Sequence, residues 1–213
     1  TDSLISVVVV LHGPPATTAR LRELAVSFPV VAAAGGAMSC FEAGVTPLWV
    51  AGDLDSAVRD RLPADWELRH YPEQTRTDFQ KVMGDLGPEM KKVLILGGLG
   101  RRTDHLITNL MIAATLDASL RIRFEAEEES LFRVTPEVRF ERDLPPGQVL
   151  SLLPLPEATG VQTRGLRWNL DQAEMRPGGQ LGQSNEVTGP VSVTVSAGCL
   201  YVWTPRLAEG GQE

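Results

Sequence analysis

The sequence predicts a two-part fold, in which a mostly parallel α/β layer domain is followed by an all-β domain. Up to about residue 125, apolar β-branched runs alternate with stretches of helical periodicity, the pattern of a parallel sheet covered by helices. Beyond residues 126–131 this periodicity fades, and short strand-like runs separated by Pro and Gly replace it, as in a β-sandwich. The 213 residues are 43% hydrophobic and 22% charged, which supports a buried core. We therefore expect an α/β domain at residues 1–127 and a β-sandwich domain at residues 128–213.

The first half contains strand-like runs that are almost continuously apolar, as expected of strands buried on both faces of a parallel sheet. Strands are predicted at residues 5–11, 29–34, 46–50, 66–70, 92–96 and 121–125. Helices are predicted at residues 17–27, 37–44, 55–62, 77–86 and 104–118. Because open α/β sheets bind their ligands beyond the carboxyl ends of the strands, we expect functional residues in the loops that follow the strands.

The second half has shorter runs, and its helical periodicity is weak. Strands are predicted at residues 131–134, 138–140, 149–153, 160–163, 191–195 and 200–203. In residues 191–195 apolar and polar side chains alternate with a period of two, which indicates one buried and one solvated face.

Composition narrows the classes of function. A net charge of −7 argues against a nucleic-acid-binding protein, which needs a basic face, but leaves a small anionic ligand such as a nucleotide open. The apolar run at residues 4–11 is too short to span a membrane and lacks a basic flank. Cys40 and Cys199 have no CxxC spacing, so we expect a reducing compartment. These features predict a cytoplasmic protein with neither a nucleic-acid nor a membrane partner.

Two carboxylates follow the strand predicted at residues 46–50. The segment reads Gly52-Asp53-Leu54-Asp55-Ser56, and it places Asp53 and Asp55 at positions i and i+2. Adjacent carboxylates repel each other unless a cation lies between them, and a divalent metal that carries a phosphorylated substrate is such a cation. The alternative is that Asp55 and Ser56 cap the helix that follows.

Three further loops at predicted strand ends carry glycines, acids and basic residues. They are residues 34–37, 73–81 and 97–105. Together with the Asp53 loop they would supply amides for phosphate, acids for metal and cations for charge neutralisation, as phosphoryl transfer requires. A Walker loop with a GKS or GKT ending is absent from the sequence, so this is not a P-loop enzyme.

Each of these residues also has a structural interpretation when it is taken singly. Gly35-Gly36 is compatible with a tight turn, and Asp78 with capping or dipole complementation at a helix start. Lys81 is compatible with an ordinary i, i+3 pair with Asp78. Asp104-His105 likewise opens a predicted helix. The functional interpretation therefore depends on the shared location of these loops.

In their order and spacing, these segments resemble the thiamine pyrophosphokinase family. The matching segments are Gly52-Asp53-Leu54-Asp55-Ser56, residues 74–81, residues 100–105 followed by Asn109, residues 165–170 and residues 182–186. The resemblance covers nearly the whole chain, and it rests on the ordered series because any one motif is weak. It implies transfer of pyrophosphate from ATP to the hydroxyl of thiamine, which gives thiamine diphosphate and AMP.

The resemblance also implies residue roles on the ATP side. Mg²⁺ would be held by Asp53, Asp55 and Asp78, and the catalytic group would add Lys81 and Arg102 as neutralisers of phosphate charge. The remaining ATP-binding residues would be Gly35, Gly36, Gln74, Thr77, Gly100, Asp104 and His105.

On the thiamine side, the family is a homodimer whose thiamine sites lie between the α/β domain of one subunit and the β domain of the other. Trp168 would stack on thiamine, which suits a cationic thiazolium ring. Ser184 and Asn185 would hydrogen-bond its aminopyrimidine. The alternatives are that Trp168 belongs to the sheet core and that Ser184-Asn185 forms a turn.

Two positions depart from the family pattern. Ala34 stands where the family has an acid, and Arg101 stands where it has a glycine. A lost acid lowers the charge that holds a metal. Two alternative functions therefore remain: a pyrophosphokinase acting on another heterocycle such as a pterin, and a catalytically weakened regulator that binds thiamine or a nucleotide.

Overall fold

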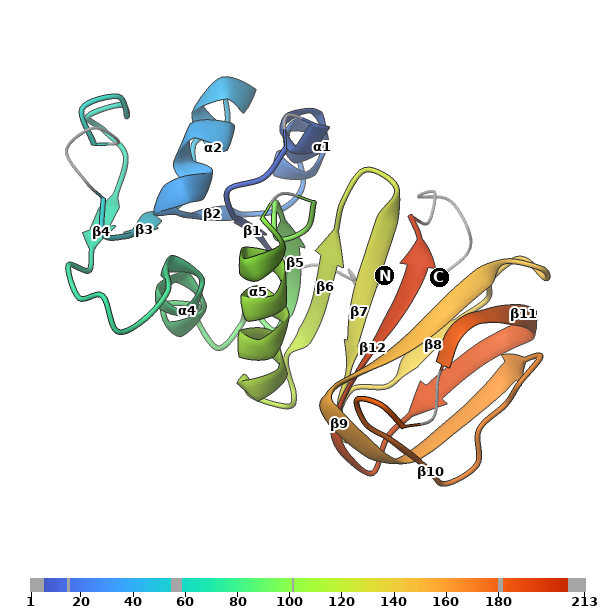
Figure 1. Ribbon diagram of the computed structural model, residues 1–213. Helices are drawn as coiled ribbons and strands as arrows, with labels where there is room; N and C mark the ends of the chain where they lie inside the picture. Colours follow the sequence, from blue (N-terminus) through green and yellow to red (C-terminus); the bar gives the residue numbers. More distant parts are fainter. Residues whose placement is uncertain (1–5, 15, 55–58, 101, 180–181, 207–213) are drawn as a thin grey trace. The chain divides into compact units, whose positions relative to one another are not determined.

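The computed structural model describes residues 6–14, 16–54, 59–100, 102–179 and 182–206. The chain divides into two compact units, which are Thr1–Asn109 with Phe124–Glu127, and Leu110–Arg123 with Glu128–Glu213. Figure 1 colours the first from blue to green and most of the second from yellow to red. None of the helices in the described ranges has the length and hydrophobicity needed to cross a bilayer.

The first unit is built on a parallel sheet. Its strands lie in the order β4-β3-β2-β1-β5, with bounds β1 Val7–Val10, β2 Val30–Ala33, β3 Val50–Gly52, β4 Leu68–His70 and β5 Lys92–Leu96. Each neighbouring pair is parallel. The helices are α1 Ala16–Ala25, α2 Ala37–Ala43, α4 Asp78–Gly84 and α5 Thr103–Thr115, and a single 3₁₀ turn, η1, spans Ala34–Gly36. The predicted α/β class is confirmed.

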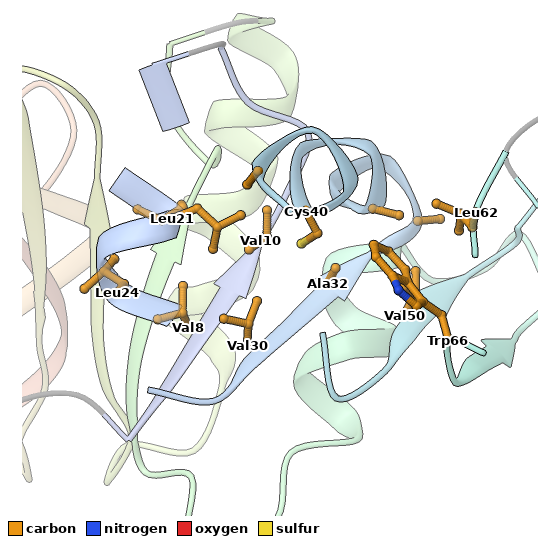
Figure 2. Close-up of a cluster of buried hydrophobic side chains, with 14 of the residues drawn as sticks. Val8, Val10, Leu21, Leu24, Val30, Ala32, Cys40, Val50, Leu62 and Trp66 are labelled. Atoms are coloured by element: carbon orange, nitrogen blue, oxygen red, sulfur yellow. The ribbon is translucent and has the colours of Figure 1, made fainter. Parts of the chain in front are cut away.

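Burial on both faces of the sheet explains why the central strands of this unit are almost continuously apolar. All four residues of β1 are fully buried, because helices cover both faces of the sheet. Figure 2 shows one face, where Leu21 of α1 and Cys40 of α2 lie over Val8 and Val10. The helix α4 lies on the opposite face, against β2 and β3 (Figure 1).

Most elements of this unit lie where the sequence predicts them, but the strand predicted at residues 46–50 is displaced. β3 begins at Val50 and continues through Gly52, so Asp53 follows it directly. Pro47 lacks an amide donor, and pairing with β2 begins only where Leu48 N donates to Val30 O at 2.7 Å. Residues 55–58 of the helix predicted at 55–62 lie outside the described residues.

The second unit is the predicted β-rich part. Its strands are β7 Glu129–Val134, β8 Phe140–Arg142, β9 Val149–Leu166, β10 Ala173–Met175, β11 Gly182–Thr194 and β12 Ala197–Pro205. Their order is β7-β12-β9-β11-β8, and β10 pairs with β9. The helix α5 and the strand β6 (Arg121–Glu125) each contribute residues to both units.

The two long strands β9 and β11 give this unit its layers. One end of β11, from Gly182, pairs with the start of β9, and the other end, to Thr194, pairs with the last residues of β9. β9 must therefore bend back, as Figure 1 shows. The bend encloses a core that includes Leu150, Val161 and Val193.

Here the predicted strands at 149–153 and 160–163 were wrong as separate elements, because they are two parts of β9. Pro154 and Pro156 suggested a break, but the strand bends and continues through them. β10 and the first half of β11 were not predicted.

Candidate functional site

The carboxyl ends of β1, β2, β3 and β5 meet through glycines that leave no room for a side chain. A Cβ atom placed on Gly36 would lie 2.1 Å from Val10 O, and one on Gly97 would lie 2.3 Å from Leu11 O. A Cβ on Gly52 would lie 2.5 Å from Ala34 Cβ. The loops that contain Ala34, Gly52 and Asp78 are thus in contact with one another, and Gly97 meets the end of β1.

A cavity of about 870 Å³ opens at this edge, within the range of small-molecule sites. It is lined by Leu11, His12, Ala33, Gly35, Thr77, Asp78, Phe79, Gly97, Gly98, Leu99, Arg102, Asp104, His105, Leu106, Thr108 and Asn109. Six residues that the sequence assigned to the nucleotide are in this lining. Gly36, Gln74, Lys81, Gly100 and Asp53 are described but do not line it.

Asp78 enters the cavity at the start of α4 because its neighbour takes the capping role. Thr77 Oγ1 accepts a hydrogen bond from Gln80 N at 3.2 Å, and Thr77 N donates to Gln80 Oε1 at 2.9 Å. This capping box fixes the helix start without the Asp78 carboxylate. The Thr-Asp-x-Gln order therefore keeps the Asp78 carboxylate out of the helix cap.

Lys81 lies behind Asp78 and not in the cavity wall. Its side chain is 2% exposed, and its Nζ is 3.2 Å from Asp78 Oδ1. The i, i+3 pair that the sequence allowed is therefore present. The buried ammonium beside Asp78 helps to fix the position of the Asp78 side chain.

Arg102 and Asp104 form a two-point ion pair at the start of α5. Arg102 Nε donates to Asp104 Oδ1 at 3.1 Å, and Nη2 donates to Oδ2 at 2.6 Å. This hydrogen bonding lowers the pKa of Asp104 and raises the pKa of Arg102. Both side chains are exposed, so the pair contributes little to stability. An anionic ligand in the cavity would compete with Asp104 for the guanidinium.

His12, directly after the strand predicted at residues 5–11, also lines the cavity. Its Nδ1 is 2.9 Å from Gly35 O. Because a carbonyl oxygen only accepts, Nδ1 carries the hydrogen, and Nε2 of the neutral ring is an acceptor. A polar residue directly after a buried parallel strand was the signal for this position.

The proposed metal ligands are described only in part. Asp53 is exposed directly after β3, and Asp78 Oδ1 would lie 2.9 Å from a Cβ on Gly52, so the two acids come from touching loops. Asp55 lies outside the described residues, and within the described ranges no three His, Cys, Asp or Glu residues form a metal cluster. Mg²⁺ commonly uses one or two carboxylates together with substrate phosphates and water, so this donor set fits it.

The second unit presents an exposed tryptophan. Trp168 is 56% exposed, so the alternative that it belongs to the sheet core is wrong. Asn185 is 5% exposed and holds the Trp168 backbone, accepting from Trp168 N at 3.2 Å and donating to Trp168 O at 2.8 Å. Its Oδ1 also accepts from Glu186 N at 2.9 Å. Three of the four hydrogen bonds available to this amide are therefore used within the protein.

Charged neighbours flank the tryptophan ring. The Arg167 guanidinium carbon lies 4.9 Å from the centre of the Trp168 ring, and Arg167 Nη1 is 3.1 Å from Glu186 Oε2. Ser184 is exposed with a φ of 56°, and its amide donates to Ser151 Oγ at 2.9 Å. The Trp168 ring thus lies near a cation whose charge is paired with Glu186.

Family models match both halves of the chain. A model described as the catalytic domain of thiamin pyrophosphokinase matches residues 23–124. A model described as the vitamin B1 binding domain of thiamin pyrophosphokinase matches residues 135–200.

Individual relatives agree with these matches. Thiamine pyrophosphokinase 1 of Oryza sativa subsp. japonica is 31% identical over 177 residues, which cover 74% of this chain and 65% of that protein. The chain thus spans slightly less than two thirds of this relative. Thiamine pyrophosphokinase from Bacillus subtilis superposes with a TM-score of 0.71 at 17% identity, covering 95% of this chain and 100% of the other. Thiamin pyrophosphokinase from Candida albicans superposes with a TM-score of 0.74 at 15% identity, covering 95% of this chain and 89% of the other.

At these identities the solved structures establish the fold alone. The two family models are stronger evidence for the family, because they match successive parts of the chain. The catalytic-domain model matches the part that contains the cavity, and the vitamin B1 binding model matches the part that contains the exposed Trp168. This chain belongs to the thiamine pyrophosphokinase family.

Proposed function

We propose that this chain transfers pyrophosphate from ATP to the hydroxyl of thiamine, giving thiamine diphosphate and AMP. The observation that carries the proposal is the cavity at the carboxyl edge of the parallel sheet. It brings Asp78, Arg102, Asp104 and His105 together from two helix starts that belong to the matched catalytic segment. Relatives of this chain are named thiamine pyrophosphokinases.

In this proposal the α/β domain, residues 1–127, binds ATP and a divalent metal, which we take to be Mg²⁺. Asp53, Asp55 and Asp78 hold the metal, which supplies positive charge to the reacting phosphates. Arg102 exchanges its bond to Asp104 for a bond to phosphate. The further contacts to ATP are assigned to Gly35, Gly36, Gln74, Thr77, Gly100, Asp104 and His105.

Lys81 acts through Asp78 in this arrangement. Its burial and its 3.2 Å contact with Asp78 keep that carboxylate oriented, and they leave direct phosphate neutralisation to Arg102. The Thr77–Gln80 capping box orients the same helix start. Catalysis then consists of positioning and charge neutralisation, which suits a loose phosphoryl transition state.

The β domain, residues 128–213, binds thiamine. Trp168 offers its exposed face to the cationic thiazolium ring, and Ser184 and the free amide hydrogen of Asn185 face the aminopyrimidine. The three internal hydrogen bonds of Asn185 support a second role, which is to hold Trp168 in place. We also place the protein in the cytoplasm, a proposal supported by the absence of a disulfide between the buried Cys40 and Cys199.

We further propose that the functional assembly is a homodimer. The helix α5 is rich in apolar residues, yet Ile107 is 47% exposed and Met111, one turn later, is 55% exposed. Two apolar side chains on one helical face favour a protein partner. Light scattering should give twice the chain mass, and Met111→Lys should shift it towards the monomer. A monomeric wild-type protein would contradict this proposal.

An assay of AMP release tests the activity. Purified protein with ATP, Mg²⁺ and thiamine should release AMP in proportion to thiamine diphosphate, and omission of either thiamine or metal should stop both. An absence of thiamine-dependent AMP would refute the proposed function.

Asp53→Asn and Asp55→Asn test the metal assignment within that assay. Each variant should lower kcat by about two orders of magnitude, since loss of one preorganised charge contact commonly has that effect. The exposed Asp143→Asn serves as the matched control and should match the wild type. Wild-type rates in both loop variants would show that these acids do not hold the metal.

Ala34 favours one second candidate, a weakened enzyme that serves as a regulator. Its side chain is 4% exposed and faces the contact between Gly52 and Asp78, where the family acid would stand. Ala34→Asp discriminates between the two functions. A large gain in turnover would favour a site weakened by loss of the acid, and an unchanged rate would favour a site that works without it.

A further inference from the structure

The loop at residues 71–77 lies between two elements of the first unit that carry proposed metal ligands. At its end, Thr77 caps α4, and Asp78 is the first residue of that helix. On the neighbouring strand, β3 ends at Gly52, directly before Asp53. A Cβ on Gly52 would lie 2.9 Å from Asp78 Oδ1. The spacing of the two acids therefore depends on how α4 is held against the end of β3.

Packing alone does not fix this spacing. The helix α4 has seven residues and packs on β2 and β3. Apolar contact is non-directional, so it holds the helix on the sheet but does not determine its position along its own axis. Directional contacts are needed for that, in addition to the buried side chains of Phe79, Lys81, Val82 and Met83.

Tyr71, the first residue of the loop, makes two such contacts. Its backbone N donates to Gly52 O at 2.8 Å. Its hydroxyl donates to the Asp85 carboxylate, whose two oxygens lie 2.7 and 2.9 Å away. Asp85 is the residue that ends α4, where its own N donates to Val82 O at 3.1 Å. One residue thus joins the end of β3 to the far end of the helix that begins with Asp78.

The surroundings of Asp85 strengthen its bond with Tyr71. The Asp85 side chain is 18% exposed, and Arg69 Nη1 lies 3.4 Å from its Oδ2. The Arg69 guanidinium is itself held over the ring of the buried Trp49, at 4.0 Å from the ring centre. Hydrogen bonds to a carboxylate are stronger than those between neutral groups, and partial burial protects this one from competition with water.

These contacts form a closed ring within the first unit. Gly52 bonds to Tyr71, and Tyr71 bonds to Asp85. From Asp85 the helix runs back seven residues, or about 10 Å, to Asp78, which lies against Gly52. If one link of the ring is removed, the start of α4 can shift relative to Asp53. Mg²⁺ tolerates such shifts poorly, because it requires nearly octahedral coordination at about 2.0–2.1 Å.

We propose that Tyr71 is a positioning residue for the metal site, which sets the spacing of Asp53 and Asp78 by tying the end of β3 to the end of α4. The inference rests on the proposed function in one respect only, namely that these acids bind a divalent metal that carries ATP. It assigns control over metal-dependent nucleotide binding to a hydroxyl outside the cavity lining.

Tyr71→Phe tests the proposal, because it removes the hydroxyl and keeps the ring. Calorimetry measures the dissociation constant of ATP with Mg²⁺ and, separately, with EDTA in place of Mg²⁺. The constant with Mg²⁺ should rise about fivefold, the worth of about one hydrogen bond. The constant without metal should stay within about twofold, because the two acids contact ATP only through the metal.

Ser6→Ala is the matched control in the same unit. It also removes one hydroxyl, which donates to Lys92 O at 3.2 Å where β5 begins, at the end of the sheet opposite the cavity. This variant should leave both ATP constants unchanged, even if its unfolding temperature falls as far as that of Tyr71→Phe.

Variants of Asp85 test whether Tyr71 acts through that carboxylate. Asp85→Ala should weaken Mg²⁺-ATP binding at least as much as Tyr71→Phe does. Adding Tyr71→Phe to Asp85→Ala should cause no further loss, because the two residues act through one bond. Asp85→Asn keeps an acceptor for the hydroxyl, so its constant should stay within about twofold of the wild type.

Three results would overturn the proposal. They are an unchanged Mg²⁺-ATP constant in Tyr71→Phe, equal weakening with and without metal, and a full effect of Tyr71→Phe in the Asp85→Ala protein. If Tyr71→Phe does not fold, the comparison of Asp85→Asn with Asp85→Ala decides the question. A wild-type protein that binds ATP more tightly with Mg²⁺ but releases no AMP would refute the proposed function and leave this test intact. A wild-type protein whose ATP binding is independent of Mg²⁺ would overturn the inference itself.

Discussion

The two candidate sites are built by different means. At the sheet edge of the first unit, glycines let backbones touch, and the charged side chains pair with one another, as in Asp78–Lys81 and Arg102–Asp104. In the second unit, the amide of Asn185 holds the backbone of Trp168, and the ring stands exposed.

This difference follows from the ligand that each site is proposed to hold. A polyanionic nucleotide with a metal needs charges that are already in place and can change partners, which internal ion pairs provide. A flat cation needs an aromatic face held rigidly by neutral groups, since a rigid face loses little entropy on binding. We therefore expect the first site to lose function when a substitution introduces a steric clash or changes a charge. We expect the second site to lose function when a substitution removes the hydrogen bonds that hold the tryptophan rigidly.

Gly52→Ala should have the largest effect, because it introduces a Cβ at 2.5 Å from Ala34 Cβ and 2.9 Å from Asp78 Oδ1. We expect turnover near background and a loss of about 1–3 kcal/mol in the free energy of unfolding, as for an overpacked site. Kinetics and urea unfolding measure both quantities. Gly189→Ala, where a Cβ has open space, is the control and should leave both nearly unchanged. An active Gly52→Ala protein would mean that contact between these loops does not control the site.

A comparison of Asn185→Ala with Trp168→Leu separates the structural role of Asn185 from the proposed thiamine-binding role of the Trp168 ring. Asn185→Ala leaves Trp168 N, Trp168 O and Glu186 N without partners, so it should cost about 2–3 kcal/mol in stability and raise KM for thiamine. Trp168→Leu should raise the same KM about tenfold or more without a change in unfolding temperature, because the ring is 56% exposed. KM for ATP should be unchanged in both variants. Equal stability losses would contradict the distinction.

Glu186→Gln should have a smaller effect, confined to the charge beside the ring. It leaves the Arg167 cation 4.9 Å from the Trp168 ring without its carboxylate, so KM for cationic thiamine should rise about threefold. Inhibition by a neutral aminopyrimidine fragment of thiamine should stay constant. Adding Arg167→Met should restore the KM; failure of that restoration would mean that Glu186 attracts thiamine directly.

The buried thiols should show the smallest effect. Burial raises the pKa of the Cys40 thiol to about 12 and that of Cys199 to about 11, so neither should react with iodoacetamide at pH 8 until the protein unfolds. These folded-state pKa values lie above the ordinary value of 9.0. Between pH 9 and the folded-state pKa values, the native protein therefore binds more protons than the unfolded chain. The stability that these thiols contribute should be complete below pH 9 and decline as pH rises towards 12. Mass spectrometry after alkylation checks the reactivity, and modification of native protein would contradict it.

The sequence predicted the first unit better than the second for a physical reason. Buried parallel strands are short and apolar and lie between helices, so β5 and β6 were placed at their observed bounds. In the second unit β9 bends through Pro154 and Pro156, which local patterns indicate as a break. Whether a proline interrupts a strand depends on which backbone groups its neighbours need, and that is a long-range property.

For the candidate site, too, some features could be predicted from the sequence and others depend on the tertiary structure. The sequence by itself determined the α/β-then-β fold and predicted a ligand site at one edge of the sheet, with Asp53, Asp78 and Arg102 in its loops, because periodicity and strand-end chemistry are local. Only the family resemblance singled out Trp168. Tertiary structure alone decided that Lys81 lies behind Asp78, that His12 joins the cavity and that Asn185 holds Trp168. It also decided that Tyr71 meets Asp85 at the end of α4. Such contacts join residues that are far apart in the chain or depend on burial, and only the folded packing specifies either.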